Sequence, residues 1–320
     1  MQKRKLGNSG LEIAPLAFGG NVFGWTANEA TSFELLDAFV AAGGNLIDTA
    51  DVYSRWAPGN TGGESETIIG NWLKRGGSRS GDKREKVVIA TKVGLEIGPD
   101  RKGLSKAHIL RSAEESLKRL QTDYIDLYQS HAEDNTTPLE ETLEAYAQLI
   151  RQGKVRAIGA SNYSAEQLRK AIELGAQRGY PGYQSLQPQY NLYNRAEFEN
   201  ELEPLCLEMN IGVINYYPLA SGFLTGKYRS DADLGKSARG QGVKKYLDER
   251  GFRILRALDE VAQSHRSTPA KVALAWLMAR PSITAPIASA TNLAQLSELI
   301  EATRLKLDNG SIETLNRASA

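Results

Sequence analysis

Short apolar runs alternate with longer amphipathic segments along most of the chain. Nearly continuous apolar runs of this kind are typical of strands that are covered on both faces, as in a parallel sheet. Eight such runs predict strands at residues 15–18, 45–48, 87–92, 124–131, 155–161, 185–187, 211–216 and 283–287. The pattern therefore predicts a parallel sheet whose strands are separated by helices.

Several helix starts are readable in the segments between these runs. Ser105 precedes a helical pattern, and Thr268 followed by Pro269 predicts another start, in a helix that ends before Pro281. The residues from Thr137 to Glu140, with Pro138 at the first helical position, have the pattern of a capping box. We expect a helix to begin at each of these three places.

Eight strand-and-helix units in 320 residues predict an α/β fold, a (β/α)8 TIM barrel that forms a single domain over residues 1–320. A doubly wound sheet is the alternative, but no G-x-G-x-x-G motif stands between a predicted strand and a helix. After the seventh strand comes a long polar loop, residues 229–250, rich in Gly, Ser, Asp, Lys and Arg. A loop of this length in a compact domain is either a functional lid or disordered.

Composition excludes several functions. The 39 basic and 38 acidic residues give a net charge of +1, so no global field attracts nucleic acid or an anionic membrane. One cysteine, Cys206, and three scattered histidines offer no disulfide and no zinc spacing, so we expect no metal. Neither a secretory signal nor an apolar run of membrane-spanning length is found in the sequence. A cytoplasmic protein is expected, and its oligomeric state stays open.

Four reactive side chains stand where consecutive predicted strands end. Asp48 and Tyr53 follow the second strand, Lys92 closes the third and His131 closes the fourth. The active site of such a barrel lies at the carboxyl ends of its strands, so these side chains are expected at one rim. Each has a structural reading by itself: a turn-forming aspartate, a packed tyrosine, a solvated lysine and a buried histidine. Their conjunction on neighbouring strands favours an active site.

This set of groups suits general acid catalysis. We expect the Lys92 ammonium to lower the pKa of the Tyr53 phenol, while Asp48 keeps Lys92 charged. His131 would donate a hydrogen bond to a carbonyl oxygen and orient it. Tyr53 would then deliver a proton to that oxygen as it becomes negative during reduction.

The chain resembles the aldo-keto reductase family over essentially its whole length. The matching segments, in the family's order, are KRKLGNSGLEIAPLAFGG, DTADVY, GESETIIGNWLK, VVIATKVG, YQSH, VRAIGASNYS, LQPQYNLYNR, INYYPLASGFLTGKY and KVALAWLMARP. The resemblance implies reversible NAD(P)H-dependent reduction of aldehydes and ketones to alcohols, with hydride from C4 of the nicotinamide. It places the family's catalytic tetrad on Asp48, Tyr53, Lys92 and His131, with Tyr53 as the proton donor.

The resemblance also implies a nicotinamide cofactor bound on the barrel without a Rossmann domain. Ser161, Asn162 and Gln187 would hold its carboxamide, Tyr216 would stack on the nicotinamide ring, and residues 218–227 would wrap the pyrophosphate. The expected cofactor-binding residues are Gly20, Asn21, Asp48, Ser161, Asn162, Gln187, Tyr216, Pro218, Leu219, Ser221, Gly222, Leu224, Gly226, Lys227, Arg239, Ser289, Thr291 and Gln295.

One departure from the family concerns the adenosine 2′-phosphate. Many members carry a Gly-Ala-Arg-like run near the eighth strand, where residues 287–292 here read IASATN without an arginine. Ser289 and Thr291 are expected to meet the phosphate instead, with Arg239 or Lys236 reaching in from the long loop. NADPH is the expected cofactor, and NADH or dual use stays open.

Aromatic residues after the first two strands suggest the substrate. Phe23, Trp25 and Trp56 are predicted to form a wall over Tyr53 and His131, which favours neutral or aromatic carbonyls or sugars and argues against phosphorylated substrates.

Two other functions remain open. One is a cofactor-binding regulatory subunit similar to the β-subunits of potassium channels, which share this fold. The other is a Schiff-base lyase with Lys92 as the nucleophile, which a protonating Asp48 partner disfavours.

Overall fold

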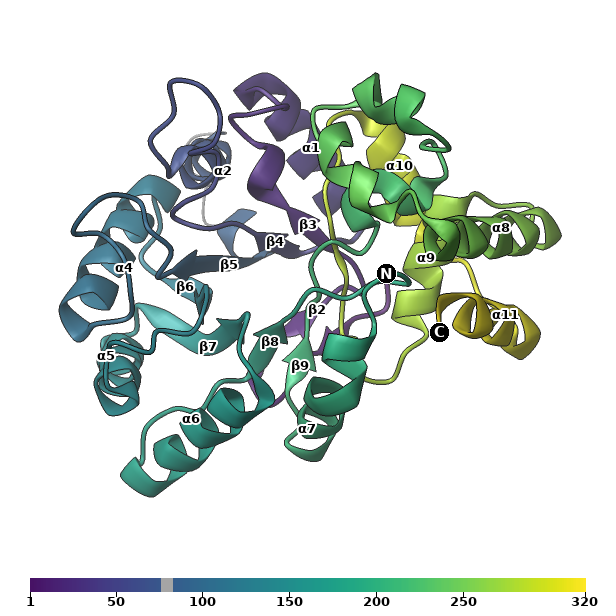
Figure 1. Cartoon of the computed structure of the whole chain (residues 1–320). Helices are drawn as coiled ribbons and strands as arrows, with labels where there is room; N and C mark the ends of the chain where they lie inside the picture. Colours follow the sequence, from purple (N-terminus) through teal and green to yellow (C-terminus); the bar gives the residue numbers. More distant parts are fainter. Residues whose placement is uncertain (76–82) are drawn as a thin grey trace.

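A computed structural model describes residues 1–75 and 83–320, and its centre is a parallel sheet of eight strands (Figure 1). Six of the strands pair in parallel with the next strand along the chain, and the last strand pairs in parallel with the first. In spatial order the strands are β10 (Ile287–Ala288), β3 (Ala17–Gly19), β4 (Leu46–Asp48), β5 (Val88–Val93), β6 (Ile125–Ser130), β7 (Val155–Ser161), β8 (Ser185–Gln187) and β9 (Gly212–Val213).

Backbone contacts between β9 and the segment before β10 close the sheet on itself. Thr284 and Ala285 donate their N–H groups to the carbonyl of Val213, and Ile287 donates to Asn215. The seventh and eighth strands, β9 and β10, are shorter than the sequence predicted. Beyond them, pairing continues only as isolated bridges, such as the one between Gln189 and Tyr216. The closed parallel sheet with flanking helices confirms the (β/α)8 barrel.

Helices surround the sheet (Figure 1). Their bounds are α1 (Glu29–Ala41), α2 (Glu64–Lys74), α4 (Lys106–Leu120), α5 (Leu139–Arg151), α6 (Ala165–Arg178), α7 (Glu203–Glu208), α8 (Glu249–Ser264), α9 (Pro269–Met278), α10 (Leu293–Ala302) and α11 (Asn309–Ser319).

Helices begin at all three predicted places, and two of the three have a side-chain cap. The side chain of Ser105 accepts a hydrogen bond from the N–H of the third residue of α4, and Thr268 does the same for α9. The capping box at Thr137 is wrong. Its hydroxyl donates instead to Asp134 (2.7 Å), and Pro138 precedes the first residue of α5 without a side-chain cap. The Asp134 carboxylate is held in place to accept the Thr137 hydroxyl, because it also accepts the backbone N–H groups of Thr136 and Leu104.

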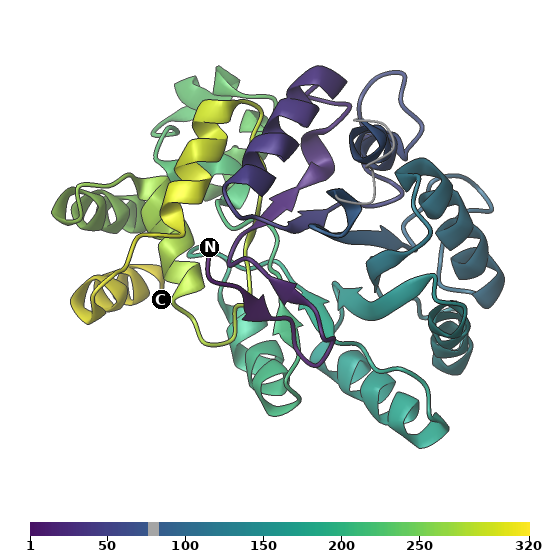
Figure 2. The same ribbon diagram turned by 180° about the vertical axis from the view of Figure 1, so that it is seen from behind.

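An antiparallel hairpin of β1 (Arg4–Lys5) and β2 (Glu12–Ile13) crosses the amino-terminal end of the barrel (Figure 2). Its apolar residues Leu6, Leu11 and Ile13 are buried against residues of the barrel interior, Leu46 and Val88 among them. The sequence analysis did not predict this hairpin, since each of its strands has only two residues. The hairpin covers one end of the barrel, so the carboxyl ends of the strands form the other.

The long polar loop after β9 is folded over this other end. It contains two 3₁₀ helices, η4 (Asp231–Lys236) and η5 (Gly240–Tyr246). Tyr246 is buried and stacks on Phe223 at a ring-centroid distance of 5.5 Å, and Tyr193 packs against its other side at 4.9 Å. This aromatic packing fixes the loop and places residues 236–239 at the open end of the barrel.

Candidate active site

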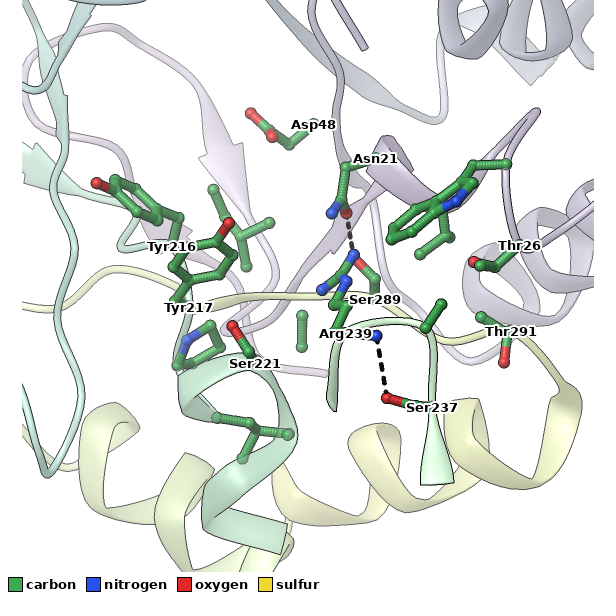
Figure 3. A pocket seen from close by; sticks show the side chains of 18 of the residues that line it. Asn21, Thr26, Asp48, Tyr216, Tyr217, Ser221, Ser237, Arg239, Ser289 and Thr291 are labelled. Atoms are coloured by element: carbon green, nitrogen blue, oxygen red, sulfur yellow. Dashed lines mark hydrogen bonds between the residues drawn. The ribbon is translucent and has the colours of Figure 1, made fainter. Parts of the chain in front are cut away.

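A cavity of about 880 Å³ lies at the carboxyl ends of the strands (Figure 3). Its lining comes from the loops that follow β3, β4, β5, β6, β7, β9 and β10, so it is shared by segments far apart in the sequence. Asp48, Tyr53 and His131 line it, and Lys92 lies directly behind Tyr53. The structure therefore brings together the four residues of the predicted tetrad.

Lys92 is the centre of this cluster. It is fully buried, and its Nζ donates to Asp48 Oδ2 (2.8 Å), to the carbonyl of Thr49 (2.8 Å) and to the Tyr53 hydroxyl (2.9 Å). Three acceptors engage the three protons of an ammonium group. Lys92 therefore has no free lone pair for a Schiff base, and this geometry disfavours the lyase.

The other oxygen of Asp48 is held by two amides. Gln187 Nε2 donates to Asp48 Oδ1 at 2.9 Å, and Gln129 Nε2 lies 3.5 Å from the same oxygen. Gln187 was predicted to hold the cofactor carboxamide, and its amide nitrogen donates to Asp48 in this structure. Gln129 was missed by the sequence analysis, although a buried glutamine inside the apolar run of β6 was a signal for it.

Burial controls the protonation of this cluster. It raises the pKa of Tyr53 well above its ordinary value, and the nearby Asp48 carboxylate adds to this effect. The net direction is opposite to the expected lowering, because burial is the largest cause and the Asp48 carboxylate adds to it. Burial also lowers the pKa of Lys92, and Asp48 opposes that change. The phenol thus keeps its proton at neutral pH, as a proton donor must.

His131 is buried beside Tyr53, with 6.0 Å between the ring centroids. Burial, with a smaller effect of the Lys92 cation, lowers its pKa well below the ordinary histidine value. Its Nδ1 has no hydrogen-bond partner among the described residues. A neutral imidazole of this kind retains hydrogen-bonding capacity for a ligand in the cavity.

The four residues predicted at the nicotinamide form a chain of hydrogen bonds. The Tyr216 hydroxyl donates to Asn162 Oδ1 (2.8 Å), and Asn162 Nδ2 lies 3.2 Å from the Ser161 hydroxyl. Ser161 in turn donates to the carbonyl of Gln187. All four residues line the cavity, so the structure brings them together as expected.

The segment after Tyr216 has an unusual backbone. Tyr217, Ala220, Ser221 and Gly222 all have left-handed φ angles, of 53°, 47°, 58° and 96°. Turns can form concave sites of N–H groups for anions, but two N–H groups of this run, those of Ala220 and Gly222, already donate to the carbonyls of Tyr217 and Leu219. Of the residues predicted to wrap the pyrophosphate, Pro218, Leu219, Ser221, Gly222 and Lys227 line the cavity.

Three predicted cofactor residues lie elsewhere. Leu224 is fully buried in the hydrophobic core, and Gly226 ends the 3₁₀ helix η3 (Ala220–Thr225) with a φ of 79°. Gly20 is buried and its carbonyl accepts the Ser65 hydroxyl. These three residues lie in the packed part of the loops, outside the lining of the cavity.

The far end of the cavity is formed by residues after β10. The Ser289 hydroxyl donates to Asn21 Oδ1 (2.6 Å), as Figure 3 shows, and the Thr291 hydroxyl donates to Gln295 Oε1 (3.1 Å). The helix α10 begins directly beyond, capped by Asn292. All four predicted residues at this end, Asn21, Ser289, Thr291 and Gln295, line the cavity.

The aromatic wall differs from its prediction in one member. Trp56 packs edge-on against both Trp25 (5.8 Å between centroids) and Tyr53 (5.9 Å), so these residues form one wall. Phe23 does not belong to it. It is fully buried and packs on Phe18, because the backbone turns it into the core.

Two residues of the cavity mouth were missed. Trp56, Leu95 and Tyr217 are 48%, 38% and 43% exposed there, on three different loops. Exposed apolar side chains gathered at one opening indicate contact with a ligand. Leu95 lies just beyond the matching segment VVIATKVG, whereas Tyr217 stands inside INYYPLASGFLTGKY directly after Tyr216, and that position was a signal for it.

Arg239 and Lys236 reach the cavity from the long loop, but in different ways. Lys236 is exposed and its Nζ pairs with Asp233 (2.7 Å). The Arg239 side chain extends into the middle of the cavity (Figure 3), and its guanidinium lies 5.4 Å from the centre of the Trp25 ring. Arg239 thus lies in the interior of the cavity and Lys236 at its edge, and a third cation, Lys227, also lines it.

A comparison with known protein families decides the assignment. The model of the aldo/keto reductase family matches residues 15–320. The chain belongs to the aldo/keto reductase family. It is accordingly an oxidoreductase of a family that acts on small molecules and generally uses nicotinamide cofactors.

Individual relatives agree with this assignment. An uncharacterized oxidoreductase of Bacillus subtilis, YrpG, is 38% identical over 99% of this chain and 95% of its own length. A probable voltage-gated potassium channel subunit beta of Arabidopsis thaliana is 34% identical, with 94% and 91% covered. The L-glyceraldehyde 3-phosphate reductase of Escherichia coli is 32% identical, with 94% and 87% covered. The chain is therefore similar to proteins named for catalysis and to one named for a channel.

The described residues contain neither a membrane-spanning helix nor a cluster of metal ligands. Within residues 1–75 and 83–320, no helix has the length and apolar character needed to cross a membrane. In the same part of the chain, no group of three or more His, Cys, Asp or Glu side chains is arranged to hold a metal ion.

Proposed function

We propose that this aldo/keto reductase is an NADPH-dependent reductase of aldehyde and ketone carbonyls that also runs in the alcohol-oxidising direction. The observation that carries the proposal is the position of the Tyr53 hydroxyl. It faces the cavity, it is bound from behind by the Lys92 ammonium, and burial keeps it protonated.

The lining of the cavity fits a nicotinamide dinucleotide. The Tyr216 ring and the amide of Asn162 suit the nicotinamide end, since they offer a π-face and polar atoms. The left-handed backbone from Tyr217 to Gly222, with Lys227 beside it, suits the pyrophosphate. A bound nicotinamide would supply the hydride.

The chain's own residues would then manage the proton. The substrate carbonyl oxygen lies between the Tyr53 hydroxyl and the neutral His131 ring, which together orient it. Tyr53 donates its proton as negative charge develops on that oxygen, and the alcohol forms. The Lys92 ammonium stabilises the resulting phenolate, and Asp48 compensates the buried charge of Lys92.

Preference for NADPH depends on the far end of the cavity. Ser289 and Thr291 present hydroxyl groups there, and the N-terminus of α10 adds a favourable field for a phosphate. This arrangement supports NADPH as the cofactor despite the missing arginine. NADH, which lacks the 2′-phosphate, would lose these contacts.

The test is the variant Tyr53→Phe, which removes the hydroxyl and keeps the ring. We expect kcat for an aldehyde such as benzaldehyde to fall by about 10²–10⁴-fold, the usual contribution of a positioned acid. Binding of NADPH, followed by quenching of tryptophan fluorescence, should stay within about twofold. Tyr180→Phe, outside the cavity, is the matched control. Normal turnover by Tyr53→Phe would contradict the proposal.

A cofactor-binding subunit is the second candidate, because of the relative named as a potassium channel subunit beta. The tetrad permits both functions. Tight NADPH binding by the wild-type protein without turnover of any carbonyl in a broad panel would favour the subunit. Turnover that disappears in Tyr53→Phe would favour the reductase.

A further inference from the structure

A glutamine lies buried inside the barrel, close to the floor of the cavity. Gln129 is fully buried, and its partner in the neighbouring strand β5 is Lys92, so both side chains face the barrel interior. The interior positions beneath this level are apolar, among them Leu127 of the same strand and Ala90 of β5. Burying an amide without hydrogen bonds costs free energy, so its partners indicate why a glutamine stands here.

Both ends of this amide contact residues of the active site. Gln129 Nε2 lies 3.5 Å from Asp48 Oδ1, and Gln129 Oε1 lies 3.4 Å from Gln187 Nε2. Gln187 Nε2 also donates to Asp48 Oδ1, at 2.9 Å. Among the described residues, no other hydrogen bond engages the Gln129 side chain. The three side chains therefore form a closed triangle, and Gln129 has no polar partner outside it.

The chemistry of these groups fixes the orientation of both amides. An ionised carboxylate only accepts hydrogen bonds, so Asp48 Oδ1 requires the nitrogen of each amide to point toward it. Gln129 then presents its oxygen to the second N–H of Gln187. Both N–H groups of Gln187 are used inside the protein in this way. Its oxygen Oε1 has no partner among the described residues, and Gln187 lines the cavity.

The neighbouring strands leave room for the Gln129 side chain. Gly159 is the partner of Gln129 in β7, and it is also the partner of Ser185 in β8. A Cβ at Gly159 would lie 3.1 Å from Gln129 Cγ and closer still to Ser185 Oγ. A larger residue at this position would therefore force one of the two side chains to shift. The glycine allows Gln129 to reach Asp48 and Gln187 across the barrel interior.

Resting on the proposed binding of a nicotinamide cofactor, we propose that Gln129 is a positioning residue for Gln187. It holds the Gln187 amide with its nitrogen on Asp48 and its oxygen toward the cavity, where that oxygen accepts an N–H of the nicotinamide carboxamide. Gln129 thereby links the carboxamide to Asp48 and, through Asp48, to Lys92. Without Gln129, the second N–H of Gln187 loses its acceptor, and the amide gains freedom to turn toward the cavity.

Two dinucleotides that differ in one group test this role by their binding to the full-length protein. NADP⁺ carries the carboxamide, and its 3-acetylpyridine analogue has a methyl group in place of the NH₂. Calorimetry gives the ratio of their dissociation constants. The wild type should bind NADP⁺ at least about fivefold more tightly, because the analogue leaves Gln187 Oε1 unpaired. In Gln129→Met, this ratio should fall by about 2–10-fold, the value of one neutral hydrogen bond.

Two controls separate positioning from a general disturbance. Preference for NADP⁺ over NAD⁺, which the far end of the cavity is proposed to determine, should stay within about twofold of the wild type in Gln129→Met. Gln184→Met makes the same substitution before β8, outside the cavity lining, and both ratios should match the wild type. If Gln129→Met does not fold, Gln129→Asn keeps the amide and shortens the side chain, so it should lower the same carboxamide-dependent ratio.

Turnover separates this inference from the proposed reductase. A protein that reduces no aldehyde, but whose ratio for NADP⁺ and its analogue depends on Gln129, would overturn only the carbonyl reduction. Three results would overturn the role of Gln129. The wild type binds NADP⁺ and its analogue equally or binds neither, the ratio is unchanged in Gln129→Met and Gln129→Asn, or the preference for NADP⁺ over NAD⁺ falls by the same factor.

Discussion

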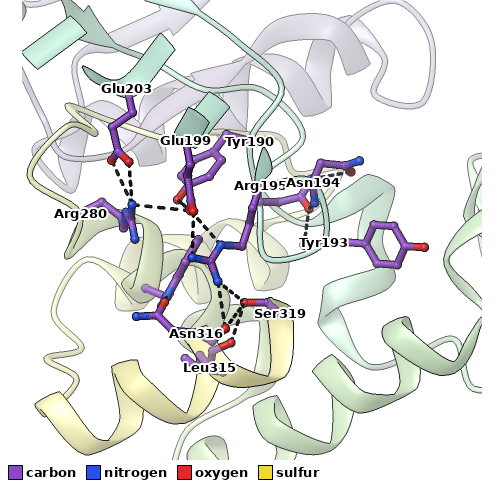
Figure 4. A network of polar contacts seen from close by, with 12 residues as sticks. Tyr190, Tyr193, Asn194, Arg195, Glu199, Glu203, Arg280, Leu315, Asn316 and Ser319 are labelled. Carbon is purple, nitrogen blue, oxygen red and sulfur yellow. Dashed lines mark hydrogen bonds and ion pairs between the residues drawn. The ribbon is translucent and has the colours of Figure 1, made fainter. Parts of the chain in front are cut away.

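Two polar clusters of this protein, one buried and one partly buried, use charge in opposite ways. One lies around Lys92 at the open end of the barrel. The other lies at its side, where Arg195, Glu199, Glu203 and Arg280 fix the C-terminal helix α11 (Figure 4). Both are built from ion pairs at 2.8 Å. The clusters differ in what determines the ionisation of their groups, which is pairing in one and burial in the other.

In the cluster beside α11, pairing determines the ionisation of the groups. Burial by itself would raise the pKa of Glu199, but hydrogen bonds from Arg195 and Tyr190 hold it below its ordinary value. Arg195 also donates to the carbonyl of Asn316 (3.0 Å) and to the Ser319 hydroxyl (2.8 Å). Pairing keeps the Glu199 carboxylate ionised, and the contacts of Arg195 hold the last helix against the barrel.

Around Lys92, burial determines the protonation. The pKa of Tyr53 is raised and those of Lys92 and His131 are lowered, each with desolvation as the largest cause. His131 Nδ1 and Arg239 Nη2 also lack partners among the described residues. Arg280 Nε in the other cluster lacks a partner as well, so what distinguishes the cavity is that ionisable groups with perturbed pKa values gather in it, as they do at binding and reaction sites.

Replacing the central cation should produce the largest effect. In Lys92→Met the buried Asp48 carboxylate loses its partner, and breaking a buried pair costs about 3–5 kcal/mol in the free energy of unfolding. Carbonyl reduction should fall below detection, because the Tyr53 phenolate is no longer stabilised. Urea unfolding and steady-state kinetics measure the two effects. A stable and active Lys92→Met protein would remove the distinction between the two clusters.

Disrupting the other cluster should affect stability alone, and less strongly. Glu199→Gln keeps the shape of the side chain and removes its charge, so Arg195 and Arg280 lose a common partner. We expect a loss of about 1–3 kcal/mol in the free energy of unfolding. Since Glu199 does not line the cavity, kcat for the aldehyde should stay within about twofold. A large fall in kcat at unchanged stability would show that this cluster also acts on catalysis.

Much of the barrel and its tetrad could be predicted from the sequence, because both depend on local pattern. Apolar runs marked most strands. The positions of Asp48, Lys92 and His131 at strand ends predicted one rim, and the structure confirms the contact between Lys92 and Asp48. Parallel strands of a barrel end on the same side, so the order along the chain was sufficient.

The errors concern contacts between distant segments. Whether Phe23 faces the cavity or the core depends on Phe18 beneath it, and the capping of α5 depends on Asp134. The pKa of Tyr53 was predicted in the wrong direction, because Lys92 was visible in the sequence and the degree of burial was not. A sequence shows which groups are present, but the balance between charge and desolvation is a property of the fold.

The protonation state of Tyr53 tests this contrast most directly. Ultraviolet difference spectra of the wild type and Tyr53→Phe, recorded as the pH is raised, isolate the ionisation of this one phenol. Because burial and Asp48 raise its pKa, the account predicts no Tyr53 phenolate even at about pH 10, where free tyrosine is half ionised. A phenolate signal from Tyr53 that appears near neutral pH would contradict it, and would mean that the Lys92 cation controls the site.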